Sequence, residues 1–563
     1  MKSLSKYLSI SLFLILAFSC QDFLEEENKS NITAENYFTS ESGYESLVNA
    51  AYGTLRSAIG SAGGSRGFPF MFMSGVDIYN RGESQLVGGT YENRDVHSSE
   101  LNEYGSLDAE NEFVANFYTD FYYAIQVCNT AISRADKVEG ISDSRKNQLL
   151  AETKVLRAYY YYNLVEQFGD IPLVNEEITA AVTHFERTPE EQIYQFLISE
   201  LEASVDNLPA VPAEFGRVTK GAANHLLSLV YLTRGYKSYA DTNDFSKAAS
   251  LADAVINSGT YSLQTTFKEV FDRDNETNDE IILSIQYAVG AGLEGSLQSR
   301  QFGWLLYEKE LGFTYEDLTY PQQYPQFTPS QFLYSLFNTN IDSRYDGTFN
   351  SEYFATIDVP ASGINKGDLR VYFPKPDQPF TTQDSLDFMA QHPVANIITK
   401  SHWLPDIENL GGSGKFPMIW KFHDPNTTNV EVSTRDIILF RLAETYLIAA
   451  EAYYKSGDNA KAAARISSLR TRAALPEKTT EMQINASDVN IDFILDERAR
   501  ELAGEYKRWY DLKRTGKLVE RTLMHNVLAK RANALTSKHL LRPIPQSVID
   551  RDSGEFPQNP GYN

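Results

Sequence analysis

Residues 151–174, AETKVLRAYYYYNLVEQFGDIPLV, constrain the fold more than any other stretch of this 563-residue chain. Apolar and aromatic side chains occur nearly all round a 3.6-residue helical wheel here, so a helix formed by this stretch must be covered by neighbours on every side. Gly169 tolerates the positive φ that often ends a helix, and Pro172 prevents continuation. The stretch therefore predicts a central helix of an all-helical stack.

Helical periodicity recurs on both sides of this helix. The predicted helices span residues 36–56, 111–137, 142–168, 188–208, 221–236, 246–257, 435–454, 459–472 and 490–514. At the start of 188–208, Thr188, Pro189 and Glu191 have the spacing of a capping box with proline at the first helical position. The pair 435–454 and 459–472 has the length of a tetratricopeptide unit, about 34 residues. The predicted fold class is mainly α, a tetratricopeptide-like helical-repeat scaffold.

Strands and loops are expected in two regions. Residues 280–289 are rich in β-branched side chains and form the best strand candidate. Residues 60–104 are rich in Gly and Ser and predict a long loop, which in a compact protein is usually functional. Residues 290–429 hold many aromatics, prolines and glycines without a sustained period. They predict an irregular, loop-rich insert with few short strands.

The N-terminus has the pattern of a secretory signal. Lys2 and Lys6 precede an apolar run over residues 7–18, which is too short to span a membrane stably. Cys20 at the end of that run resembles the lipidated cysteine of bacterial lipoproteins. A signal peptide over 1–19 is therefore expected, although a plain secreted protein with a chance cysteine is the alternative.

The residues after this cysteine support a surface anchor. The segment QDFLEEE is acidic, and the remainder of 20–34 is a short polar tether. Acyl chains on Cys20 would anchor a globular domain without a transmembrane helix. Export to the outer face of an outer membrane is implied by the likeness of this acidic segment to surface lipoproteins.

Several kinds of chemistry are disfavoured by the sequence. The formal net charge of −24 disfavours nucleic acid as a partner. The eight histidines include no i, i+4 pair and Cys128 lacks a partner, so neither a transition metal nor another cofactor is expected. The G-x-S-x-G at 63–67 lacks a flanking strand and helix, and the G-x-G-x-x-G at 290–295 lacks a βαβ repeat. The acids and bases of 496–514 favour a structural ion-pair network over catalytic carboxylates.

Three ordered groups of residues resemble the SusD/RagB family of outer-membrane nutrient-binding lipoproteins. The stretch 151–174 is similar to the family's AE.r.LRA.yY..Lv..fGdiPLv helix, and the chain ends in a family-like QNPGY at 558–562. The third group is Arg498, Glu501, Glu505, Arg508, Trp509, Asp511, Leu512 and Arg514. The resemblance covers almost the whole mature chain, except that 290–429 matches no family pattern.

The resemblance implies one domain over residues 35–563. Its helical scaffold would occupy about 35–260 and 431–563, and its insert about 261–430. A SusC-like TonB-dependent transporter would be the protein partner, and the protein would lie on the cell surface. Its function would be to capture an oligosaccharide and deliver it to that transporter, without breaking a bond.

A neutral sugar ring has an apolar C–H face and a hydroxyl rim, so proteins hold it with flat aromatic rings and side-chain hydrogen bonds. Family members place ligand contacts in the insert and in the loop after the first helix. The expected platforms are therefore Trp304 and Tyr307. The expected polar contacts are Asp77, Tyr79, Asn80 and Arg81. Trp403 is a further candidate, whereas Trp420 and Trp509 are assigned structural roles.

Two other classes of function remain open at this point. A peptide-binding member of the same family, or a helical-repeat adaptor, would use the same scaffold without binding glycans. A surface glycoside hydrolase would need a carboxylate pair, and 75 acidic residues give no means of selecting one from spacing.

Overall fold

The computed structural model describes residues 37–60, 67–82, 96–288, 295–321, 323, 326–403 and 414–562, and the backbone of 86–87 and 90–91. The predicted signal peptide, Cys20 and the tether lie outside these residues. No helix in the described part of the chain combines the length and the apolarity that a membrane crossing requires.

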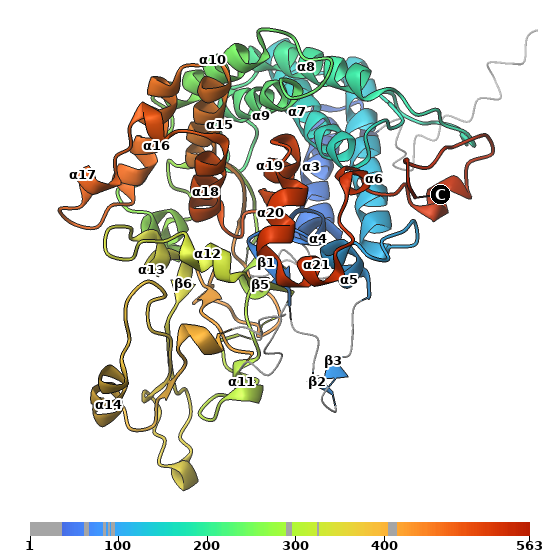
Figure 1. The fold of residues 1–563 in the computed structure, drawn as a ribbon. Coiled ribbons are helices and arrows are strands. Elements are labelled where there is room, and N and C mark those ends of the chain that lie inside the picture. The colour runs from blue at the N-terminus through green and yellow to red at the C-terminus, as the bar shows by residue number, and fades with distance from the viewer. Residues whose placement is uncertain are drawn as a thin grey trace, which may run out of the picture.

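A stack of helices forms the body of the molecule (Figure 1). Its members are α3 (Glu41–Leu55), α6 (Glu112–Arg134), α7 (Asp143–Phe168), α8 (Glu190–Val205), α9 (Lys220–Arg234), α10 (Asp244–Ile256), α15 (Leu442–Lys455), α16 (Asn459–Arg472) and α18 (Ile491–Leu502). From α6 to α10 each helix packs on the next, and α10 packs directly on α15. The stack therefore continues across the long insert, which confirms the predicted mainly α, repeat-like fold.

Helix α7 lies at the centre of the stack, as its sequence predicts. Every residue from Val155 to Phe168 is buried, and Gly169 ends the helix with φ of 71°. The buried tyrosines have polar partners: the hydroxyl of Tyr160 lies 2.7 Å from that of Thr54, and Tyr161 donates to the carbonyl of Val174. A buried helix rich in tyrosine is therefore stable because the phenol groups are satisfied.

Two antiparallel strands close the base of the insert. β4 (Ile281–Ile285) pairs with β11 (Ile437–Arg441), which confirms the strand predicted in 280–289. The helix predicted over 435–454 is wrong at its start, since 437–441 form β11 and α15 begins at Leu442. The β-branched residues of β11 complete a ladder with β4, and this tertiary pairing overrides helical periodicity.

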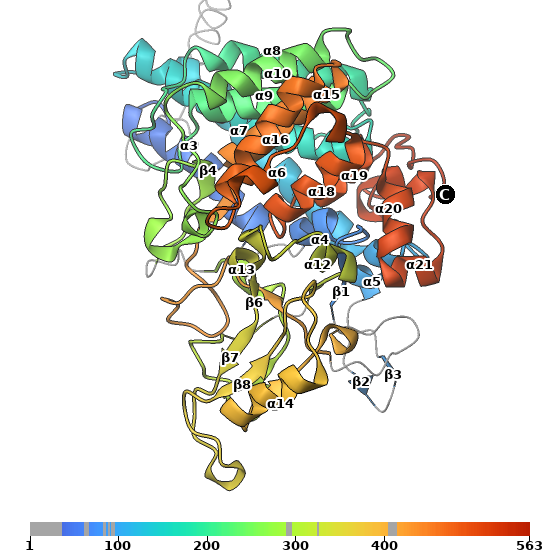
Figure 2. The ribbon, with the colours of Figure 1, turned by 60° about the vertical axis from the view of Figure 1, so that its left-hand side comes forward.

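The insert is built from short elements that project away from the stack (Figure 2). Its strands are β5 (Phe327–Pro329), β6 (Phe349–Asn350), β7 (Glu352–Phe354), β8 (Leu369–Tyr372), β9 (Asn396–Ile397) and β10 (Met418–Ile419). Its helices are α11 (Leu306–Lys309), α12 (Gln331–Ser335), α13 (Arg344–Thr348) and α14 (Thr382–Gln391). β10 pairs with β6, and β8 lies between β7 and β9.

The region predicted as one long loop, 60–104, contains regular structure. It holds α4 (Gly67–Met73), β1 (Tyr79–Arg81), β2 (Leu86–Val87), β3 (Thr90–Tyr91) and α5 (Val96–Glu103). All residues of α4 are buried, and β1 pairs with β5 of the insert. The sequence of α4, GFPFMFM, begins with glycine, but its aromatic and methionine side chains are strongly apolar. Their burial makes α4 pack into the core.

The C-terminal part also departs from one prediction. The single helix expected over 490–514 is two helices, α18 and α19 (Arg508–Arg514), because Gly504 and Tyr506 adopt φ of 81° and 57° between them. Four short helices complete this region: α17 (Thr479–Met482), α20 (Leu518–His525), α21 (Val527–Ala532) and α22 (Gln546–Ile549).

The predicted capping box of α8 does not form. Pro189 occupies the N-cap position without a side-chain cap, and Thr188 instead pairs through its backbone with Ile171. The carboxylate of Asp170 accepts from the Glu190 amide at 2.7 Å. A side chain from the preceding turn therefore replaces the expected local cap.

Candidate functional site

Trp420 lies where two neighbouring hollows of the insert meet, and it lines both. It follows β10 directly, and its amide donates to the carbonyl of Thr348 at 2.7 Å. The next side chain, Lys421, points into the core, where its ammonium lies 2.6 Å from Glu505. This alternation leaves the indole of Trp420 half-buried at the surface.

One hollow beside Trp420 is aromatic and shallow, with a volume of about 10 Å³, so it offers an aromatic surface but cannot enclose a sugar ring. It is lined by Trp304, Leu306, Tyr307, Tyr320, Pro321, Gln323, Tyr353, Met418 and Trp420. The ring of Tyr320 lies 5.8 Å from that of Trp420, and Tyr307 meets Tyr315 edge to face at 5.4 Å. Tyr315 is 41% exposed, so aromatic surface extends from the hollow towards solvent.

The other hollow beside Trp420 is polar and has a volume of about 410 Å³. His423 stacks on the indole at this side, with ring centroids 4.1 Å apart. The exposed side chains of Lys268, Asp274 and Asn426 stand at its rim. Flat rings and hydrogen-bonding groups thus lie together, which is the combination that a sugar ring requires. We call Trp420, Tyr307, Tyr315, Tyr320 and His423 the insert site.

Of the predicted platforms, Trp304 is placed in the core. Its exposed fraction is 0%, and its indole nitrogen donates to the carbonyl of Phe416 at 2.9 Å. The expectation that its face holds a ligand is thereby corrected, because neighbours cover that face. Tyr307 is half-buried and lies at the insert site.

The predicted polar contact Asp77 is a buried ion-pair partner. Its carboxylate accepts two bonds from Arg508, at 2.7 and 2.6 Å, and one from Arg521 at 2.9 Å. Burial acts to raise the pKa of Asp77, but the two guanidinium groups outweigh it and lower the pKa. A structural role therefore replaces the expected ligand contact.

The other three predicted polar contacts lie on β1. Tyr79 is buried, and its hydroxyl accepts from the Gly504 amide at 2.6 Å. Asn80 is half-buried and its side-chain oxygen accepts from the Val527 amide. Arg81 is half-buried and pairs with Glu103 at 3.2 Å. These side chains fasten β1 to α5, α21 and the turn between α18 and α19, so the structure does not join them to the insert site.

The remaining tryptophans are structural. Trp403 is buried and its indole nitrogen donates to the carbonyl of Ile398 at 2.7 Å. Trp509 is buried in α19, as expected. The sequence assigned Trp420 a structural role, whereas the structure leaves its indole half-buried between two hollows.

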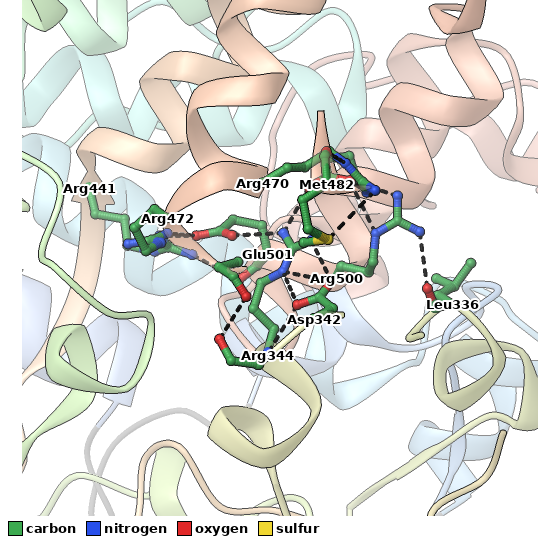
Figure 3. Close-up of polar contacts among 12 residues, drawn as sticks. Leu336, Asp342, Arg344, Arg441, Arg470, Arg472, Met482, Arg500 and Glu501 are labelled. Carbon is green, nitrogen blue, oxygen red and sulfur yellow. Dashed lines mark hydrogen bonds and ion pairs between the residues drawn. The ribbon is translucent and has the colours of Figure 1, made fainter. Parts of the chain in front are cut away.

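The charged run of α18 forms a buried ion-pair network with the insert (Figure 3). Arg344 of α13 lies 2.8 Å from Glu497 and 3.0 Å from Glu501, and Arg441 of β11 lies 2.8 Å from Glu501. Burial would raise the pKa of Glu501, but Arg472, Arg441 and Arg344 lower it to about 2. The predicted structural network is confirmed, and its carboxylates are occupied by cations.

Within the described residues, no group of three or more His, Cys, Asp or Glu side chains is arranged so that it could hold a metal ion. In the acidic loop before β4, Asp272 accepts from the Asp274 amide, and Arg273 lies 3.3 Å from Asp424. The first contact lies within the loop, and the second ties the loop to the segment after β10.

Comparison with known proteins shows which family this chain resembles in sequence. The profile of the SusD family matches residues 279–562, and a profile described as starch-binding associating with outer membrane matches residues 22–232. The SusD-like protein P2 of Formosa agariphila is 26% identical over 577 residues, which cover 99% of this chain and 100% of that protein.

Solved structures show the same fold. A laminarin-binding SusD-like protein superposes with a TM-score of 0.69 at 22% identity, covering 93% of this chain and 100% of the other. The surface glycan-binding protein A from Bacteroides thetaiotaomicron, in complex with laminarihexaose, gives a TM-score of 0.69 at 19% identity, with coverages of 92% and 100%.

Proposed function

We propose that this chain, which belongs to the SusD family, is a glycan-binding protein that holds an oligosaccharide at the insert site. Relatives and structural neighbours described as binding starch, laminarin or laminarihexaose support a glycan as the ligand. Outer-membrane association in the matching profile supports a position at the cell surface. Cys20 would carry the lipid anchor there.

The observation that carries the proposal is the place of Trp420 between the aromatic and the polar hollow. A glycan chain crossing it would lay a C–H face against the ring of Tyr315 and the part of the Trp420 indole that His423 leaves uncovered, while its hydroxyls meet Asn426, Asp274 and Lys268 at the rim. Each ring–aromatic contact buries apolar area, which favours binding by about 25 cal/mol per Å². The polar groups fix the orientation of the chain.

The protein would bind and release its ligand without breaking a bond. The acidic residues concentrated on α18 are held in ion pairs, and Glu497 and Glu501 each contact at least two arginines. A glycoside hydrolase would need one free carboxylic acid and one free carboxylate beside the sugar. Release of reducing ends from a bound polysaccharide would favour that alternative.

The receiver of the glycan would be a SusC-like TonB-dependent transporter. A transporter that accepts the oligosaccharide must lie close to the insert site when the ligand is released. Co-purification of the tagged, membrane-bound chain with one large outer-membrane protein tests this partnership. Purification of the chain alone from gently solubilised membranes would count against it.

Affinity electrophoresis tests the ligand class. The native protein should be retarded in gels containing laminarin or starch, and Trp420→Ala and Tyr315→Ala should each reduce that retardation by at least fivefold. Tyr37→Ala, which removes a tyrosine of similar exposure that lines neither hollow of the insert site, is the matched control. Migration unaffected by either polysaccharide would favour a peptide-binding member or an adaptor.

A further inference from the structure

A third hollow, with a volume of about 440 Å³, lies beside α6 and is separate from the insert site. Its walls come from three segments: α6, the chain that follows α7, and the C-terminal chain around α22. The lining residues are Tyr118, Thr119, Tyr122, Tyr123, Gln126, Pro172, Val174, Ile178, Val182, Thr183, Phe185, Val548, Arg551, Asp552 and Phe556. This volume lies within the range of small-ligand pockets, about 300–1,000 Å³.

The two outer walls are fastened together. The imidazole of His184 lies 2.5 Å from the carboxylate of Asp552, which also accepts from the Phe185 amide at 2.9 Å. The Ser553 amide donates to the carbonyl of Thr183 at 2.7 Å. The hollow is therefore a preformed feature of the fold, and both carboxylate oxygens of Asp552 already have hydrogen-bond partners.

The floor of the hollow is a stripe of α6 with unused hydrogen-bonding groups. Thr119, Tyr122, Tyr123 and Gln126 have the i, i+3, i+4, i+7 spacing of one helix face. Tyr122 donates to the carbonyl of Pro172 at 2.8 Å. The side chains of Thr119, Tyr123 and Gln126 have no hydrogen-bond partner among the described residues. Tyr123 is 63% exposed although it is a large aromatic residue.

We propose that this hollow is a second carbohydrate-binding site, which takes one or two rings of a neutral oligosaccharide. The tyrosine and phenylalanine rings supply platforms for C–H faces, and the free hydroxyls of Thr119 and Tyr123 and the amide of Gln126 supply partners for sugar hydroxyls. The lining carries one cation, Arg551, and one carboxylate, Asp552, so it offers no excess of positive charge to a polyanionic sugar.

The hollow lies apart from the insert site, so one polysaccharide chain could bind at both sites. Figure 1 shows α6 and the C-terminal end at one side of the molecule, and α13 and β6 of the insert at another. One polysaccharide molecule engaged at both sites would be held with an avidity above that of either site alone, by up to about 10²–10⁴-fold where the geometry allows. The inference rests on the proposed function only for the class of ligand.

Calorimetry on the full mature chain with laminarihexaose, and with a starch-derived hexasaccharide, tests the site. We expect two molecules bound per native chain, and one in each of Tyr123→Ala and Trp420→Ala. Gln126→Ala should weaken the second binding event by about tenfold, since it removes a hydrogen-bonding group and little surface. Tyr37→Ala, again an exposed tyrosine, should bind as the native chain does.

The outcomes separate the two proposals. One molecule bound per native chain, lost in Trp420→Ala and unchanged in Tyr123→Ala, would overturn the second site and leave the insert site standing. One molecule lost only in Tyr123→Ala would support the hollow on α6 and overturn the insert site. No binding of either hexasaccharide, together with no retardation by laminarin or starch, would overturn both.

Discussion

The imidazole of His423 lies flat on the indole of Trp420, with the ring planes inclined by 16° and the centroids 4.1 Å apart. The two residues are also joined by the backbone, since the His423 amide donates to the carbonyl of Trp420 at 2.8 Å. Burial lowers the pKa of His423 to about 4, and the nearby cations Arg435 and Arg300 act in the same direction. The imidazole that supports the insert site is therefore neutral at pH 7.

This stack predicts a specific dependence of stability on pH. The pKa of His423 is lower in the folded chain than its ordinary value near 6.5, so the unfolded chain takes up the proton first as pH falls. The free energy of unfolding should therefore fall between about pH 6.5 and pH 4, by about 3 kcal/mol for this group. In His423→Gln that part of the decrease should be missing. Urea denaturation at pH 7, 5.5 and 4 measures it, and parallel curves for the two proteins would contradict the assignment.

The buried network around α18 predicts a large loss of stability from a small change. Glu501→Gln leaves Arg344, Arg441 and Arg472 without one of their shared anions. Breaking such a pair inside a protein costs about 3–5 kcal/mol, which urea denaturation would detect. The matched control is Glu481→Gln, whose pair with Lys478 is exposed and should contribute less than about 1 kcal/mol. Equal effects of the two substitutions would contradict the network's role.

Sequence reasoning located the scaffold because its signals are local. The apolar surface of α7 follows from residues within the helix, and the capping of its ends follows from the two residues that flank it, Ser142 and Gly169. Where the structure departs from prediction, a distant partner decides. Strand β11 forms at Ile437 because β4 lies beside it, and α18 ends at a turn in which the Gly504 amide donates to Tyr79 from β1.

The site was harder to predict for the same reason. The residue type indicates that a tryptophan could form an aromatic platform for a sugar, but tertiary packing determines which tryptophan is accessible to one. Trp304 is covered by the insert, whereas Trp420 emerges at the end of β10. The carboxylate of Asp77 could accept hydrogen bonds from a sugar, but in the structure it forms ion pairs with Arg508 and Arg521, which lie far along the chain.

Trp304 and Trp420 should respond differently to substitution. Trp304→Ala removes a fully buried indole and should lower the free energy of unfolding by about 3–5 kcal/mol, while glycan affinity per folded molecule changes little. Trp304→Phe should keep both stability and binding closer to the native values. Trp420→Ala should instead lose glycan affinity at a smaller cost in stability. Thermal unfolding combined with calorimetry on laminarihexaose measures both quantities, and loss of affinity in Trp304→Phe with native stability would restore Trp304 as a contact.

The anchor proposed at Cys20 can be separated from all of these effects, because the chain has only one other cysteine. In cells fed labelled palmitate, the native protein should carry label and sediment with membranes, since acyl chains on one residue hold a globular domain at a bilayer. Cys20→Ser should lose the label and leave the membrane fraction. Cys128→Ala is the matched control: this thiol is buried in α6, and burial raises its pKa to about 12, so the residue is unreactive and its removal should leave the label in place. Label retained in Cys20→Ser would show that the anchor lies elsewhere.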